Sequence, residues 1–162
     1  METGPDPILH LRPVRFEDRG LIWQWANAPD IRAASFHPEF ITWDEHSRWF
    51  AACLQNPHCI ILVAEDKNGR AVGQVRFEPI GDGARVSISV DPAFRARGYG
   101  SWILREGLMV VARERDVQTV HAYVKKGNAP SIRLFQGCGF VAVGGETIEG
   151  SSAVHLVWTR KI

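Results

Sequence analysis

The sequence of 162 residues predicts a single α/β domain with a mixed sheet, and three observations support this fold class. Segments with strand patterns and segments with helix patterns are interspersed along the whole chain, as in domains whose helices cover a mixed sheet. No internal repeat, low-complexity run or interdomain linker separates them. A chain of this length forms one domain that buries roughly 68–70% of its unfolded surface, and a hydrophobic content of 45% argues against disorder.

The first third of the chain predicts one short strand followed by two helices. The strand is expected over residues 9–14. The first helix is expected over residues 17–28, where apolar residues recur at helical spacing until Pro29 ends it. The second is expected over residues 42–54, because its Thr-Trp-Asp-Glu start is a capping box.

The middle of the chain predicts a meander of three strands. Residues 60–64 and 71–77 flank an Asp-Lys-Asn-Gly turn, and residues 85–90 follow a Gly-Asp-Gly turn. The last of these strands alternates apolar and polar residues, which is typical of a strand whose two faces meet different surroundings.

The last third predicts two helices and three strands. A helix from Ser101 to about residue 115 carries apolar residues on one stripe, and a strand follows over residues 120–124. Asn128 is expected to cap a short helix that ends in glycines. Two final strands are expected over residues 140–143 and 153–159.

The charge pattern excludes several classes of partner. A net charge of +1 with interspersed acids and bases predicts neither a nucleic-acid nor a membrane partner.

Residues 1–7 are expected to be a short tail without the features of a secretory signal, and residues 8–162 to be the domain. We therefore expect a cytoplasmic protein.

The three cysteines are not expected to take part in a disulfide, a metal site or catalysis. Their number is odd, and the spacing of Cys53, Cys59 and Cys138 matches no disulfide framework or zinc site. We expect small buried or half-buried thiols in a reducing compartment.

The densest signal lies in residues 90–101, where a strand ends and a helix begins. Gly98 and Gly100 let the backbone approach a ligand closely, and the first helical turn presents N–H groups to an anion. Arg95 and Arg97 add positive charge with a geometry that suits phosphate. The third glycine of a dinucleotide motif and the lysine of a P-loop are absent. Taken alone, this pattern also fits a tight turn into a helix.

Further residues extend this signal into a family resemblance. The run Arg95-x-x-Gly98-x-Gly100 after Val-Asp-Pro resembles the acetyl-CoA motif of the GNAT superfamily. Residues 128–135 with Gly-Phe at 139–140 are similar to its second signature, and Leu-Arg-Pro at 11–13 resembles its usual opening. The resemblance implies a GNAT-type mixed, mostly antiparallel central sheet flanked by helices. It also implies an N-acetyltransferase that uses acetyl-CoA as co-substrate and needs no metal.

The resemblance also implies where acetyl-CoA binds. Backbone amides of the glycine loop would hold the pyrophosphate, and the pantetheine arm would lie where two neighbouring strands diverge. The cofactor-binding residues that it implies are Ile88, Val90, Arg95, Arg97, Gly98, Tyr99, Gly100, Ser101, Asn128 and Ser131.

Two positions depart from the usual catalytic pattern of the family. Many members have a glutamate where this chain has Arg85, and a tyrosine where it has Phe135. No dedicated acid or base is therefore assigned. The candidates for catalysis are Asn128, beside the pantetheine arm, and His46, Glu78 and His121, which are candidates for removing the proton of the amine.

The acceptor side resembles a narrower group. The pattern from Trp25 to Arg32, followed by Glu-His-x-x-Trp-Phe at 45–50, is similar to enzymes that acetylate the 4-amino group of nucleotide-linked aminosugars, as in pseudaminic-acid biosynthesis. This resemblance implies that Arg32 and His46 contact the sugar nucleotide, with Trp25 or Trp49 as stacking surfaces. The helical spacing of His46 among aromatic residues, taken alone, favours a core histidine over a ligand-binding one.

Two alternatives to the aminosugar acetyltransferase stay open. One is an acetyltransferase for a small amine or a protein N-terminus, as for the ribosomal-protein acetyltransferases, which share the Arg-Pro opening. The other is a non-catalytic acyl-CoA-binding sensor. Separately, exposed strands near the C-terminus suggest a homodimer.

Overall fold

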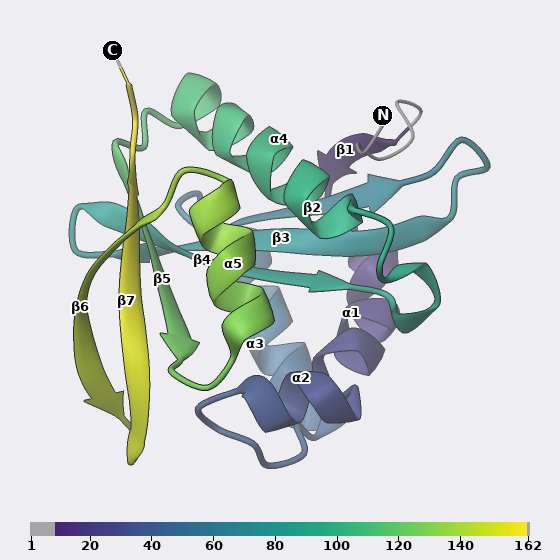
Figure 1. Cartoon of the computed structure of the whole chain (residues 1–162). Helices are drawn as coiled ribbons and strands as arrows, with labels where there is room; N and C mark the ends of the chain where they lie inside the picture. Colours follow the sequence, from purple (N-terminus) through teal and green to yellow (C-terminus); the bar gives the residue numbers. More distant parts are fainter. Residues whose placement is uncertain (1–8, 162) are drawn as a thin grey trace.

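The computed structural model describes residues 9–161 and forms a seven-stranded sheet with helices on both faces (Figure 1). The strand order is β1-β2-β3-β4-β5-β7-β6, and every neighbouring pair is antiparallel except β4 with β5. The predicted mixed, mostly antiparallel sheet is thus confirmed. The strands are β1 (His10–Pro13), β2 (Ile60–Glu65), β3 (Ala71–Ile80), β4 (Gly83–Val90), β5 (Thr119–Lys125), β6 (Val141–Ile148) and β7 (Ser151–Thr159). The expected tail, residues 1–7, lies outside the described residues.

The helices at the start of the chain differ from the prediction of one helix over residues 17–28. A 3-10 turn, η1 (Phe16–Asp18), leads into α1 (Arg19–Ala26), and Pro29 begins a further helix, α2 (Pro29–Ala34). Proline is favoured in a first helical turn because its missing N–H has no partner there. The residue that was expected to end one helix therefore also starts the next.

The other helices begin close to their predicted starts. They are α3 (Trp43–Gln55), α4 (Tyr99–Glu114) and α5 (Ala129–Gly137), with the 3-10 turn η2 (Pro92–Phe94) before α4. The capping box of α3 is present: the Glu45 amide donates to the Thr42 hydroxyl at 3.2 Å, and the Thr42 amide donates to the Glu45 carboxylate at 3.1 Å. None of the helices within residues 9–161 is long and apolar enough to cross a membrane.

Two hydrophobic cores lie on opposite faces of the sheet, and β2 contributes to both. Ile60, Leu62 and Ala64 pack in the larger core with α4 and α5, whereas Ile61 and Val63 pack with α1 and α3. Because successive strand residues point to opposite faces, this alternation defines an α4–α5 face and an α1–α3 face. The continuous apolar run of β2 is thus explained by burial on both sides.

The parallel neighbours β4 and β5 are paired only at their beginnings. Ala84 lies opposite Val120 and Arg85 opposite His121, and no further registered pair follows although both strands continue. The two strands therefore diverge beyond Arg85 and His121, as the family resemblance implied. We call this opening the splay.

The outer edge of the sheet is formed by β6, whose residues are almost all exposed. Val141 and Val143 are 64% and 58% exposed. An edge strand leaves backbone donors and acceptors without a neighbouring strand. The homodimer through the C-terminal strands stays a prediction.

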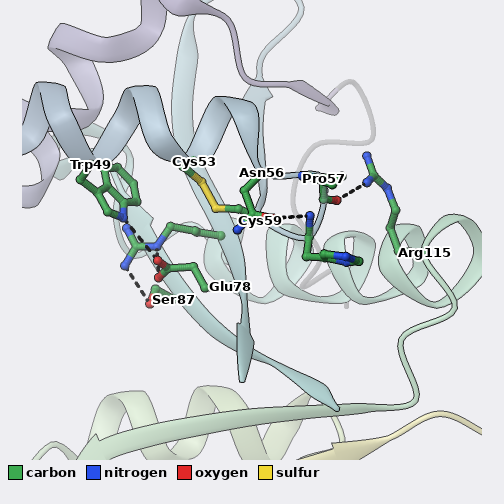
Figure 2. Close-up of a disulfide and its surroundings, with 10 residues drawn as sticks. Trp49, Cys53, Asn56, Pro57, Cys59, Glu78, Ser87 and Arg115 are labelled. Carbon is green, nitrogen blue, oxygen red and sulfur yellow. Dashed lines mark hydrogen bonds and ion pairs between the residues drawn. A yellow bond between two sulfur atoms is a disulfide. The ribbon is translucent and has the colours of Figure 1, made fainter. Parts of the chain in front are cut away.

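The cysteines contradict the expectation of three thiols. Cys53, near the end of α3, and Cys59, just before β2, form a disulfide with Cα atoms 5.5 Å apart (Figure 2). The helix end and the turn after it fold the chain back, which brings together two residues whose spacing did not suggest a pair. Cys138 is free and buried, and burial raises the pKa of its thiol.

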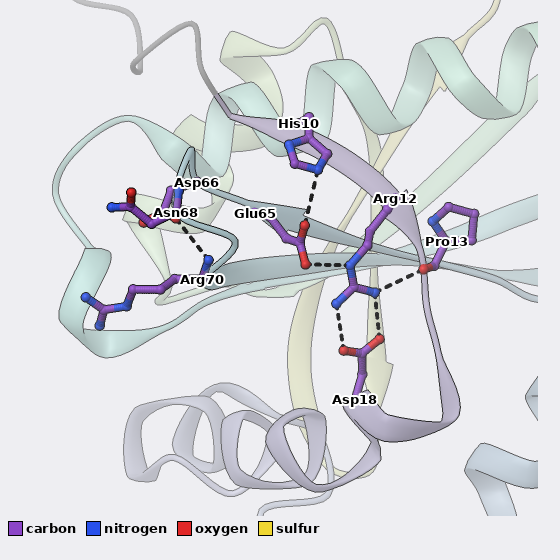
Figure 3. A network of polar contacts seen from close by, with 8 residues as sticks. All are labelled: His10, Arg12, Pro13, Asp18, Glu65, Asp66, Asn68 and Arg70. Atoms are coloured by element: carbon purple, nitrogen blue, oxygen red, sulfur yellow. Dashed lines mark hydrogen bonds and ion pairs between the residues drawn. The ribbon is translucent and has the colours of Figure 1, made fainter.

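A network of charges ties β1 to the neighbouring strand β2 and to the 3-10 turn η1 (Figure 3). The Arg12 guanidinium donates to both carboxylate oxygens of Asp18, each at 2.8 Å, and its Nε donates to Glu65 at 2.7 Å. The bond to Asp18 raises the pKa of Arg12. Burial opposes the ionisation of Asp18, but the bonds from Arg12 and from the Arg15 amide outweigh it and lower the pKa of the carboxyl.

Candidate active site

The segment between β4 and α4 is fixed at its first residue. The Asp91 carboxylate accepts a bond from the Ala93 amide at 2.9 Å and another from the Trp25 indole at 2.8 Å. Ala96 and Gly98 follow with φ angles of 63° and 78°, in the left-handed region that glycine adopts freely and alanine only under strain. These two residues turn the chain so that α4 starts directly beneath the loop.

The start of α4 leaves its amides available to a ligand. Its N-cap is Gly98, which has no side chain to accept from the first turn, whereas Thr42 serves this purpose in α3. Free N–H groups and the dipole of a 16-residue helix make an anion site. The end of the helix and the loop before it thus have the properties that a pyrophosphate requires.

A cavity of about 370 Å³ opens at this helix end and reaches the splay. Eight of the ten predicted cofactor-binding residues line it, whereas Arg97 and Ser101 do not. Sequence reasoning missed its α2 wall, formed by Asp30 and Ile31, because the helix itself was not predicted. The eight are Ile88, Val90, Arg95, Gly98, Tyr99, Gly100, Asn128 and Ser131.

An ion pair closes one side of the cavity. The Arg95 guanidinium bonds to the Asp30 carboxylate on α2, and its Nε donates to the Val90 carbonyl at 3.0 Å. Arg95 thus lines the cavity near the N-terminus of α4, but a carboxylate occupies one of its donors. Binding of an anion here competes with Asp30.

Asn128 has the capping role that the sequence predicted. Its side-chain oxygen accepts from the Ser131 amide at 3.3 Å at the start of α5. The side chain also lines the cavity. Capping and contact with a pantetheine arm are thus compatible in this position.

His46 lies in the core rather than in the cavity. The side chain is only 3% exposed, its Nε2 lies 2.9 Å from the Arg19 carbonyl, and the rings of Trp43, Trp49 and Phe50 surround it. Burial lowers the pKa of His46. The structure thus corrects the assignment of His46 as a substrate or catalytic residue and favours the core-histidine alternative.

Arg32 and Trp25 also have partners within the fold. Arg32 donates to the carbonyls of Ala26 at 2.7 Å and His37 at 2.6 Å, which joins the end of α1 to the loop after α2. Trp25 is 3% exposed, and its indole is bonded to Asp91. Trp25 therefore supports the segment before α4 and Arg32 joins α1 to the loop after α2, and neither is among the residues that line the cavity.

Trp49 and Glu78 do meet, on the α1–α3 face beside the splay (Figure 2). The Trp49 indole donates to Glu78 at 3.3 Å, and Arg76 bonds to Glu78 at 2.9 Å and to Ser87 at 3.2 Å. The Arg76 guanidinium also lies over the Trp49 ring. The carboxylate of Glu78 is thus held by two donors, an arrangement suited to structure more than to proton removal.

A second cluster beside the splay was only partly foreseen. Arg85 on β4 lies over the ring of Tyr123 on β5, and His155 on β7 stacks on the same ring. Phe135, at the usual tyrosine position, is 4% exposed and belongs to the larger core. His121, on β5 beside Tyr123, was a candidate base in the sequence, and Arg85 and Phe135 were noted as departures from the family pattern. His155 was not foreseen, because nothing in the spacing of β5 and β7 reveals that they are neighbours.

The family described as "Acetyltransferase (GNAT) domain" matches residues 9–141 of this chain. The chain belongs to the GNAT acetyltransferase family. Among curated relatives, YwnH of Bacillus subtilis, whose name assigns it provisionally to the phosphinothricin acetyltransferases, is 30% identical over 119 residues, which are 70% of this chain and 71% of YwnH. The mycothiol acetyltransferase of Acidimicrobium ferrooxidans is 30% identical over 94% of this chain, but the match spans only 46% of that relative.

Solved structures show the same fold. The spermidine N-acetyltransferase of Vibrio cholerae, solved with CoA and spermine, superposes with a TM-score of 0.85 at 20% identity, covering 95% of this chain and 96% of the other. At this identity the likeness concerns the fold alone.

The GNAT domain is an acetyl-CoA-dependent N-acetyltransferase, and its cavity fits this co-substrate. The uncapped amides of α4 suit the pyrophosphate, and Ile88 and Val90 line the cavity beside the splay, where the pantetheine arm is expected. Among residues 9–161, no group of three or more His, Cys, Asp or Glu side chains is arranged to hold a metal ion.

Proposed function

We propose that this acetyltransferase acts on a primary amine whose molecule also carries an anionic group. A nucleotide-linked 4-aminosugar is the specific acceptor that the sequence resemblance suggests. The coarser activity, transfer of acetyl from acetyl-CoA to an amine, follows from membership of the family. The charge of the acceptor rests on the residues beside the splay.

Arg85 is the observation that carries this proposal. By the family resemblance it occupies a position where many GNAT enzymes have a glutamate, and it lies at the point where β4 and β5 diverge. Among the described residues it has no ion-pair partner, since its cross-strand neighbour Glu78 is bonded to Arg76 and Trp49. A guanidinium without a carboxylate partner attracts phosphate or carboxylate groups and repels a polycation.

A substrate panel tests the proposal. Nucleotide-linked 4-aminosugars, acidic amino acids, peptides and spermidine are each supplied with acetyl-CoA, and release of CoA is measured as free thiol. We expect the anionic amines to give the highest kcat/KM. Turnover of spermidine or peptides in preference to anionic amines would contradict the proposal, and absence of thiol release with every amine would contradict catalysis itself.

Variants locate the effect. Arg85→Gln should raise KM for the anionic amine about 10- to 100-fold, as loss of one charge-assisted contact implies, and leave acetyl-CoA affinity unchanged. Arg85→Lys should recover part of the loss because it keeps the charge. Arg48, exposed on α3, supplies the matched control as Arg48→Gln, which should have no effect.

A further inference from the structure

Two histidines and a glutamate form a polar chain across the last three strands of the sheet. His121 Nδ1 lies 2.8 Å from His155 Nε2, and His155 Nδ1 lies 3.8 Å from the Glu146 carboxylate. The residues come from β5, β7 and β6, which are neighbours in the sheet. This row of polar side chains therefore extends from the splay to solvent at the outer edge of the sheet, where the Glu146 side chain is 47% exposed.

The Glu146 carboxylate determines which ring nitrogens of His155 and His121 carry hydrogen. Glu146 favours a hydrogen on the facing Nδ1 of His155, because a lone pair there would point at a negative charge. In the neutral form, His155 Nε2 then has a lone pair and accepts from His121 Nδ1–H. The remaining nitrogen with a free lone pair is Nε2 of His121.

The position of His121 is the reason to assign it a role. His121 and Arg85 form the last registered pair before the splay, and the side chains of both lie on the face opposite α4. An amine that approaches the splay from the α1–α3 face meets this end of it. Arg85 itself has no basic lone pair at neutral pH, and Glu78 is held by Arg76 and Trp49.

We propose that His121 is the catalytic base that takes the proton of the acceptor ammonium at Nε2, with His155 and Glu146 as positioning residues. This inference rests on the proposed function. Tyr123 holds the ring of His155 in place by stacking, with ring centroids 4.5 Å apart.

The chemistry balances with these groups alone. An N–H bond of the ammonium breaks, and its proton moves to His121 Nε2. The amine lone pair attacks the thioester carbonyl carbon, the C–S bond breaks as the tetrahedral intermediate collapses, and CoA leaves as thiolate. The second proton lost by the new amide nitrogen neutralises the thiolate, and the imidazolium of His121 returns its proton to solvent between turnovers.

The surroundings keep His121 neutral and therefore basic. Burial, and then the neighbouring His155, lower the pKa of His121, while Asp82 raises it. The charged and titratable groups that face this cluster are Glu78 on β3, Asp82 in the β3–β4 turn, Arg85 on β4, Tyr123 on β5, His155 on β7 and Glu146 on β6.

The pH profile of kcat/KM tests the proposal, using whichever amine of the panel is turned over best. A base acting on an ammonium gives a bell whose acid limb lies at the pKa of His121, below about 6.5, and whose alkaline limb lies at the pKa of the amine. His121→Gln should lower kcat/KM at the optimum about 10²- to 10⁴-fold. The remaining kcat/KM should lack the acid limb and should increase with pH only as the amine itself loses its proton. An unchanged acid limb in His121→Gln would overturn the assignment.

The roles of His155 and Glu146 are tested by changes in the pH profile and in kcat that a purely structural role does not produce. His155→Gln should move the acid limb to higher pH, because it removes a neighbour that lowers the pKa of His121. Glu146→Asp should keep more of kcat than Glu146→Gln, with KM for acetyl-CoA unchanged in both. His58→Gln, on the exposed turn after α3, is the matched control and should alter neither limb.

A titration without any acceptor separates this proposal from the proposed function. Labelled histidines followed by NMR should show His121 titrating below about 6.5 and moving upward in His155→Gln. If no amine is acetylated, the proposed function fails, and the titration alone decides whether the protonation of His121 is coupled to His155. The inference is overturned if His121 titrates at or above its ordinary range, or if its pKa is the same in His155→Gln as in the parent protein.

Discussion

Replacement of Gly100 by alanine separates the needs of the ligand from those of the fold. A Cβ at this position would lie 3.7 Å from Val90 Cγ2 and 3.8 Å from Leu134 Cδ1, which are ordinary van der Waals contacts. The protein therefore has room for the methyl group, and alanine in a helix is more favourable than glycine by up to about 1 kcal/mol. Gly98 is a poorer choice for this test, because its φ of 78° strains any replacement.

The added methyl group affects the co-substrate instead. Gly100 lines the cavity in the first turn of α4, where a diphosphate must approach the backbone closely. Loss of one hydrogen bond to a charged group weakens binding by about 1.5–3 kcal/mol, so the Kd for acetyl-CoA should rise about 10- to 150-fold.

Calorimetry with acetyl-CoA and a thermal melt measure the two effects on one sample. We expect weaker binding together with an unchanged or higher Tm. Gly20→Ala on α1 is the matched control, since nothing lies within 4 Å of its Cβ and it is outside the cavity. Unchanged acetyl-CoA affinity in Gly100→Ala would refute the placement of the pyrophosphate.

Three other predictions concern charge and covalent links. Asp30→Asn should tighten acetyl-CoA binding severalfold in calorimetry, because Arg95 loses its competing carboxylate; weaker binding would show that Asp30 orients Arg95 instead. Asp18→Asn should lower the free energy of unfolding by about 3 kcal/mol, because Arg12 loses a partially buried partner while Glu65 remains. The pKa of Asp18 is lowered by folding, so its contribution is present at neutral pH and is lost as pH falls below about 4; in urea melts, the difference between the parent protein and Asp18→Asn should disappear there. Reduction of Cys53–Cys59, a short loop with a sequence separation of 6, should lower stability by about 2 kcal/mol; the Cys53→Ser variant should show the same loss and no response to reductant.

The sequence predicted the sheet and the glycine loop before α4 because their signals are local. The alternation of β4, the capping box of α3 and the glycines before α4 each specify backbone conformation within a few residues. Local patterns also placed Asn128 correctly at the start of α5.

The acceptor side was harder to predict because its residues are defined by partners far along the chain. His46, Arg32 and Trp25 have residue types that commonly contact ligands, yet a carbonyl or carboxylate of the fold satisfies each of them. Composition cannot distinguish a donor that is satisfied internally from one that is free. The pairing of β5 with β7 brings together His121 and His155, which are 34 residues apart, and no periodicity reveals such a pair.

The Trp25 indole on α1 is bonded to Asp91, and the Asp30 carboxylate on α2 is paired with Arg95, so both helices are tied to the segment that leads into α4. Asp30 and Ile31 also line the cavity. Substitutions that displace α1 or α2 are therefore expected to displace the β4–α4 loop as well. Arg85 on β4 takes part in neither contact, so redesign that begins there leaves both in place.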